Sequence, residues 1–271
     1  MDVGRIARWL TVAGGIASLL IGAVFFGASN FSAGNFPWNV SPMVAMTIGA
    51  WAIGMGAIAI DCGWRWNLAR CYSALTLVWT FGVLELLVVL NFLGALRTDH
   101  LLTWPYLVAI GLTAAAAVFG GVSLYRARAE IRRAGQPIPG WVWFFIVSFI
   151  IVVGFLAVSL FLRDAQAAGQ ALFPEPLTLF TVRAFSAFFA ALVAGAVALL
   201  FSRDVAAPVE LARVGLYLIV PIIIATVANL GSFDFAARPG GLVYLGAYIA
   251  TGLIAAFSVW WYRSGTKATS A

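Results

Sequence analysis

Long apolar stretches alternate with short polar segments along this chain. Eight of the stretches each hold about 20 mostly apolar residues, the length at which an α-helix crosses a ~30 Å hydrocarbon core. Strands of a membrane β-barrel would instead alternate apolar and polar residues over about ten positions. The pattern therefore predicts an all-α integral membrane protein with eight transmembrane helices, near residues 9–27, 43–60, 71–94, 104–125, 141–162, 177–201, 211–230 and 242–262.

The composition agrees with a lipid-exposed surface. Of the 271 residues, 63% are hydrophobic and only 10% are charged, and the mean hydropathy is +1.01. Soluble domains carry about 25% charged residues. A globule of this size cannot hide so much apolar surface inside itself, so we expect the lipid bilayer to cover it.

The basic residues predict an orientation. If the N-terminus is cytoplasmic, 12 of the 16 Lys and Arg residues lie at cytoplasmic helix ends and only 3 lie outside, with Arg183 left within a span. Such a bias is typical of cytoplasmic loops, so we predict that both termini face the cytoplasm in a plasma or inner membrane. Because the net charge of +6 is spread over separate helix ends, we do not expect nucleic-acid binding.

The sequence also predicts an internal duplication. Spans four and eight match at an offset of 138, for example Tyr106 with Tyr244, and Phe36-Pro37 matches Phe173-Pro174 at 137. A third region, with "LAR" at 68–70 and 211–213, matches at 143, which predicts a six-residue insertion near a cytoplasmic helix end. We predict two tandem four-helix repeats, residues 1–136 and 137–271, related by a pseudo-two-fold axis along the membrane normal.

Small residues mark the expected packing faces of the two repeats. Helices in membranes pack closely where small residues allow their backbones to approach. Spans two and six carry such residues in "GAWAIGMGAIAI" and "AALVAGAVALL". The expected helix-packing residues are Gly49, Gly54, Gly56 and Gly195.

The segments "FPWNVSPMVAMTIGAW", "ARCYSALTLVWTFGVLELL" and "TVRAFSAF" resemble uncharacterised bacterial multi-pass membrane proteins. In that group an aromatic-Pro-Trp loop leads into a small-residue helix, commonly with an arginine shortly before a Gly-Ala-Trp stretch. Arg183 takes the arginine position in the second repeat, whereas the first repeat has Met46 there. The resemblance implies the membrane topology and no activity.

Two full charges lie within predicted spans, Glu85 and Arg183. Both are placed in the outer half of the membrane, within about 5 Å in depth at ~1.5 Å per helical residue. An unpaired charge at such depth costs about 3 to more than 10 kcal/mol. We hypothesise an ion pair between them across the repeat interface. Two alternatives stay open: Arg183 snorkels to outer headgroups, and Glu85 is protonated and bonded to a backbone carbonyl.

A few other side chains are candidates for a polar or aromatic lining of the repeat interface. They lie within the predicted spans, where polar groups often mark function. These candidates are Thr47, Trp51, Trp79, Thr80, Ser186 and Asn229.

The sequence lacks the residues that several kinds of catalytic and metal site require. The single histidine, His100, excludes bis-histidine haem and multi-histidine metal centres within this chain. Phosphate-binding and nucleophile motifs are absent from the sequence, so we predict no catalytic residues and no cofactor. The spacing of Cys62 and Cys71 is that of neither a redox pair nor a metal knuckle, and we expect two free thiols and no metal site.

Three functions remain, in decreasing order of fit. The first is an accessory subunit that binds another membrane protein or a second copy of this chain, since the spans hold few polar groups and the loops are short. The alternative is a transporter of an apolar or small-solute cargo, with its site at the repeat interface near Glu85 and Arg183. A membrane-embedded enzyme fits least, because no nucleophile–base or metal constellation can be assembled.

Overall fold

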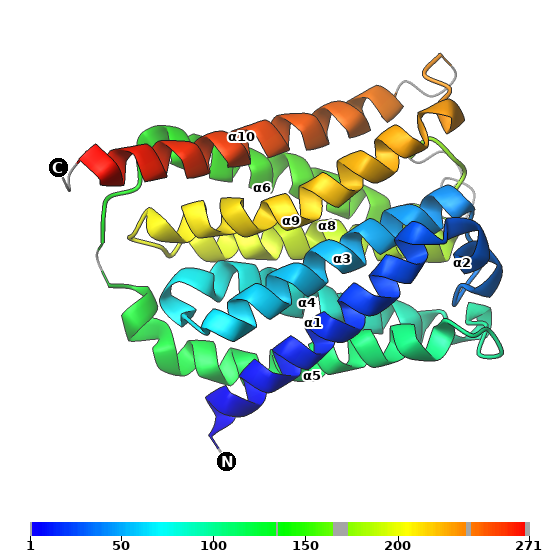
Figure 1. Cartoon of the computed structure of the whole chain (residues 1–271), viewed down its shortest axis with the longest axis horizontal. Helices are drawn as coiled ribbons and strands as arrows, with labels where there is room; N and C mark the ends of the chain where they lie inside the picture. The colour runs from blue at the N-terminus through cyan, green and yellow to red at the C-terminus, as the bar shows by residue number, and fades with distance from the viewer. Residues whose placement is uncertain (1, 134, 165–172, 237–239, 269–271) are drawn as a thin grey trace.

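The computed structural model describes residues 2–133, 135–164, 173–236 and 240–268. Within these ranges the chain has no strands, and eight helices are long and apolar enough to cross a membrane, which confirms the eight predicted spans. The long helices run across the molecule in broadly the same direction in Figure 1, with the C-terminus at the left and the N-terminus at the bottom. Their bounds are α1 (Val3–Gly27), α3 (Pro42–Arg65), α4 (Leu68–Asn91), α5 (Thr103–Ile131), α6 (Gly140–Phe161), α8 (Leu179–Leu199), α9 (Ala206–Ala228) and α10 (Gly240–Ala268).

Several helices extend beyond the apolar stretches that predicted them. Helix α5 continues to Ile131 instead of ending near residue 125, and α9 begins at Ala206 instead of near 211. The extra turns carry charged residues, which lower the local hydropathy but do not end a helix, because headgroups and water can solvate them. A short helix, α2 (Ser29–Asn35), and two 3-10 turns, η1 (Leu93–Ala95) and η2 (Leu230–Ser232), were not predicted.

Local side chains fix where the central helices begin. Ser41 and Thr178 each accept a hydrogen bond from the backbone N–H three residues later, at 3.2 Å, and so cap α3 and α8. Asn67 caps α4 in the same way. Between α3 and α4 the chain turns within Trp66 and Asn67, and Trp66 adopts a left-handed conformation with φ 40°.

The helix starts in the two halves keep a nearly constant spacing. Helix α6 begins 137 residues after α1, and the same spacing separates α8 from α3 and α10 from α5. Helix α9 begins 138 residues after α4. The turn η2 likewise begins 137 residues after η1. The helix starts show no shift of six residues between α4 and α9, so the "LAR" match at 143 lies outside their register.

Close backbone contact holds the first half together. Helix α1 packs against both α3 and α5, and α4 packs against α5. A Cβ atom on Gly22 would lie 2.7 Å from the backbone nitrogen of Ile53, and one on Gly14 would lie 2.8 Å from the Thr113 hydroxyl. Only glycine permits these approaches, so the glycines of α1 determine how near it lies to its neighbours.

The two halves meet through α3, α4, α8 and α9. Helix α3 packs against α9, and α4 packs against α8 and α9. Aromatic rings fill the space between them: Trp51 stacks on Phe188 with ring centroids 4.0 Å apart, and Trp38 stacks on Phe180 at 4.1 Å. These rings belong to the larger of two apolar clusters among the described residues.

The four glycines expected at packing faces all lie at close helix contacts, but they contact different helices. Gly54 faces Leu218 of α9, and Gly195 faces Leu77 of α4, so these two lie between the halves. Gly49 and Gly56 instead face α1 within the first half.

The outer helices of the second half pack more loosely. In the most apolar stretch of α10 only 6% of the residues are buried, and in that of α6 only 17%, against 39% in both α1 and α5. Helix α10 packs mainly against α9, and α6 mainly against α8. In Figure 1, α10 lies along one edge of the molecule, on the side opposite α5.

Candidate functional site

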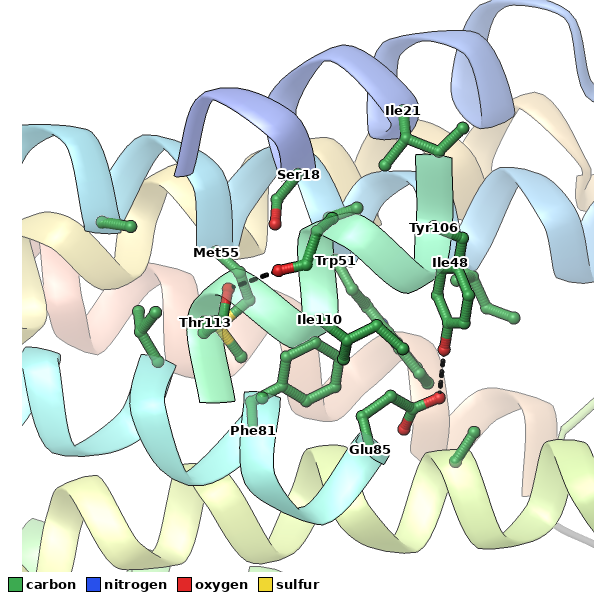
Figure 2. A pocket seen from close by; sticks show the side chains of 16 residues that line it. Ser18, Ile21, Ile48, Trp51, Met55, Phe81, Glu85, Tyr106, Ile110 and Thr113 are labelled. Atoms are coloured by element: carbon green, nitrogen blue, oxygen red, sulfur yellow. Dashed lines mark hydrogen bonds between the residues drawn. The ribbon is translucent and has the colours of Figure 1, made fainter. Parts of the chain in front are cut away.

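Glu85 lies inside the first half and pairs with a tyrosine. Its side chain comes from α4, is 2% exposed, and its Oε1 accepts a hydrogen bond of 2.5 Å from the hydroxyl of Tyr106 in α5. Figure 2 shows the two side chains pointing toward one another. The second carboxyl oxygen, Oε2, has no hydrogen-bond partner among the described residues.

A small cavity adjoins Glu85. It measures about 40 Å³ and lies among α1, α3, α4 and α5, with Ala184 of α8 also in its lining. Trp51, Phe81 and Thr113 are among its walls (Figure 2). The indole nitrogen of Trp51 also faces no acceptor among the described residues. A water molecule needs about 10–15 Å³ of such volume and two to four polar partners, so the cavity suits one to three bridging waters and no larger solute.

Arg183 occupies a different place, at the end of α6. Its Nη1 donates to the carbonyl of Leu160 and its Nη2 to that of Arg163, both at 2.8 Å, and the guanidinium lies 5.3 Å from the centre of the Phe161 ring. The last carbonyls of a helix lack intrahelical donors and carry partial negative charge. Arg183 therefore caps α6, which explains a cation within an apolar run.

The hypothesised ion pair between Glu85 and Arg183 is wrong. The sequence predicted a similar membrane depth for Glu85 and Arg183, but the two side chains leave their helices in different directions. Glu85 points into the first half toward Tyr106, whereas Arg183 points toward α6. Glu85 bonds to a phenol instead of the backbone carbonyl of the second alternative. The reach of Arg183 to outer headgroups stays a prediction.

Arg183 also lines an open lateral cleft. The cleft measures about 630 Å³ and lies between α4, α6 and α8. Arg183 forms no ion pair with a carboxylate of the described residues. The walls are otherwise mostly apolar: Leu84, Leu87, Val88, Asn91, Phe92, Ala157, Val158, Phe161, Ser186, Ala187 and Ala190.

The other lining candidates do not gather at one site. Trp51 lines the Glu85 cavity, and Ser186 lines the cleft while its hydroxyl donates to the Ala157 carbonyl at 2.8 Å. The indole of Trp79 donates to Thr11 of α1 at 2.9 Å. Thr47 and Asn229 each donate a hydrogen bond to the backbone carbonyl four residues earlier in their own helix. Thr80 is half-buried in α4.

A charged cluster at the opposite end of the molecule was not predicted. Asp61 and Arg65 of α3 and Glu210 and Arg213 of α9 form four ion pairs, two within helices and two between them. The spacings of Asp61 to Arg65 and of Glu210 to Arg213 are those of intrahelical ion pairs, so each half of the cluster was readable from the sequence. Their meeting was not, since it depends on how the two halves pack.

The two cysteines adjoin this cluster. Cys62 and Cys71 are both fully buried and form no disulfide, as expected from the sequence. Their sulfur atoms and a carboxylate oxygen of Glu210 all lie within 4.8 Å of one another. The sequence spacing alone hid this arrangement, because the third group comes from the other half of the chain.

No protein-family model, curated protein or solved structure matches this chain.

Proposed function

We propose that this protein is a non-catalytic multi-pass membrane protein of the plasma or inner membrane that serves as an accessory subunit for another membrane protein. Its two tandem four-helix repeats place both termini in the cytoplasm. The observation that carries the proposal is the contrast between a tightly filled centre and a loosely packed flank formed by α6 and α10.

The helix arrangement supports the repeat and its pseudo-two-fold axis. The axis would exchange α3 with α8 and α4 with α9, so the contact of α3 with α9 and that of α4 with α8 would be equivalent. The contact of α4 with α9 would lie on the axis itself. The constant spacing of helix starts and the equivalent caps at Ser41 and Thr178 support the same relation.

The filled centre argues against a transport path between the halves. A polar solute needs a lined and hydrated route, whereas the interface holds stacked rings such as Trp51 on Phe188. The cavity near Glu85, which reaches Ala184 of α8, is too small for a solute larger than water. The central site expected of a transporter therefore has little support.

The flank differs from its counterpart in residues as well as in packing. At a spacing of 137, Gly14 and Gly15 of α1 correspond to Ile151 and Val152 of α6. The two bulky residues are 65% and 66% exposed. The first half uses glycine to draw its own helices together. The second half presents large apolar side chains outward at the same positions, and we infer that a partner packs on them.

Photocrosslinking in native membranes tests this role. A photoreactive residue is placed at Phe155 of α6, at Leu253 of α10, or at Val118 of α5, which are 76%, 67% and 68% exposed. We expect the first two positions to give the same discrete protein adduct and the α5 control to give lipid adducts. Lipid adducts at all three positions contradict the proposal, and an adduct of twice the chain mass replaces it with self-association.

The lateral cleft favours a second candidate, the binding or carriage of an anionic amphiphile. Arg183 uses two of its five N–H groups on carbonyls and has no carboxylate partner among the described residues, while the cleft walls suit an acyl chain. Native mass spectrometry with a long-chain fatty acid and the alcohol of equal length tests it. We expect the acid to bind about tenfold more tightly, and Arg183→Met to abolish the difference while Arg97→Met keeps it. Equal retention of acid and alcohol by the unaltered protein contradicts this candidate.

A further inference from the structure

Three metal-binding side chains meet where α3 ends and where α4 and α9 begin. Cys62 comes from α3, Cys71 from α4 and Glu210 from α9, and their donor atoms all lie within 4.8 Å of one another. The two thiols are fully buried and Glu210 is 9% exposed. Two sulfur atoms and one carboxylate thus converge from both halves of the chain at one protected point.

We propose that Cys62, Cys71 and Glu210 bind a thiophilic divalent cation, with Zn²⁺ as the best match. The site is independent of the partner-binding role proposed above. Two thiolates select a soft or borderline ion, and the carboxylate oxygen favours Zn²⁺ over Cu⁺. On binding, the ion forms two metal–sulfur bonds and one metal–oxygen bond, and the two thiols release two protons to solvent.

The observed separations suit a tetrahedral site. Zn–S bonds of about 2.3 Å and Zn–O bonds of about 2.0–2.2 Å place the donors of a tetrahedron roughly 3.5–3.8 Å apart. Donors that already lie within 4.8 Å need side-chain rotations of about 1 Å and no movement of the helices. Three protein ligands leave the fourth position for water or another small ligand, as in sites where zinc is not purely structural.

The neighbouring ion pairs fit the charge and geometry of this site. Glu210 accepts hydrogen bonds from Arg65 and Arg213, and such outer contacts orient a ligating carboxylate. The carboxylates of Asp61 and Glu210 already balance the two guanidinium groups. The two thiolates therefore balance the charge of a divalent ion, and the bound cluster is neutral, as a half-buried group at a membrane surface requires.

Titration of the full-length protein with Co²⁺ and Zn²⁺ tests the proposal. The protein is purified in mild detergent, reduced and treated with a chelator before the titration. We expect one equivalent of Co²⁺ to give thiolate-to-metal charge-transfer absorption, and Zn²⁺ to displace it. The Cys62→Ser/Cys71→Ser variant should lose the absorption and the zinc.

Matched variants separate a ligand from a merely charged neighbour. Glu210→Gln should weaken Zn²⁺ binding by about 10- to 100-fold or more, and Arg213→Met by about 10-fold through loss of orientation. Glu130→Gln removes an exposed carboxylate of α5 and should leave the affinity unchanged. Zinc binding that survives in the double cysteine variant overturns the proposal.

A second measurement uses the unaltered chain, in case the variants fail to fold. X-ray absorption at the zinc edge of the zinc-loaded protein should show two sulfur neighbours and lighter oxygen neighbours. A shell of only oxygen or nitrogen, or reduced protein that binds no zinc, overturns the proposal.

Discussion

The two halves of this protein share an arrangement of helices and differ in how tightly it closes. In the first half α1 lies against α3 and α5 through glycines, and a buried acid of α4 bonds to a tyrosine of α5. In the second half α6 and α10 each rest mainly on one inner helix. The comparison teaches that similar helix registers do not impose similar packing, because side-chain volume at the contact decides how closely two helices approach.

The largest effect is expected from a glycine of the tight half. Gly22→Ala places a Cβ 2.7 Å from a backbone nitrogen of α3, so one helix must move, and we expect a loss of about 2–3 kcal/mol. The residue 137 positions later is Ser159, and Ser159→Ala should cost less than about 0.5 kcal/mol. Unfolding in a denaturing detergent, followed by circular dichroism, measures both. Equal costs would mean that close approach is not what distinguishes the halves.

A smaller effect is expected from the buried acid of the first half. Tyr106→Phe leaves the Glu85 carboxyl without its donor, and we expect a loss of about 1–3 kcal/mol. The double variant Tyr106→Phe/Glu85→Leu should recover most of that loss, because no buried polar group is then left unpaired. At the same register the second half has Ile222, where Ile222→Leu should cost less than about 1.5 kcal/mol. Additive effects of the two first-half changes would show that the pair is not coupled.

The smallest effect is expected at the helix cap in the second half. Arg183→Met copies the residue found at position 46 of the first half and removes the guanidinium donors from the carbonyls of Leu160 and Arg163, which we expect to cost about 1 kcal/mol. Arg183→Lys should retain part of the stability, and Met46→Leu should change it less. Thermal unfolding monitored by size-exclusion chromatography compares the three. If Arg183→Met leaves the thermal stability unchanged, capping of α6 is not the reason for this arginine.

The number of membrane-spanning helices was predictable because lipid demands one continuous apolar run for each crossing. The ends of the helices were harder to predict, since α9 begins before the strongly polar Glu210 and not after it. The caps at Ser41 and Thr178 follow familiar rules and were readable in principle.

The pairing of Glu85 was not predictable from depth along the membrane. Helices that are apolar on every side give no periodic signal of which face turns inward, so the rotation of α4 and α8 about their own axes stayed undetermined. Tyr106 was visible only as a residue of the duplication, not as a donor. The approach of Glu210 to Cys62 depends on contacts between distant parts of the chain, which local patterns do not encode.

The short turn at Trp66 has a consequence for biosynthesis. Helices α3 and α4 emerge from the ribosome almost as one hairpin, yet they share fewer contacts with each other than α3 makes with α9 or α4 makes with α8. A nascent chain released before α8 and α9 therefore exposes the inner surfaces of that hairpin to lipid or to an insertase. The hairpin thus completes its packing only after the second half has been made.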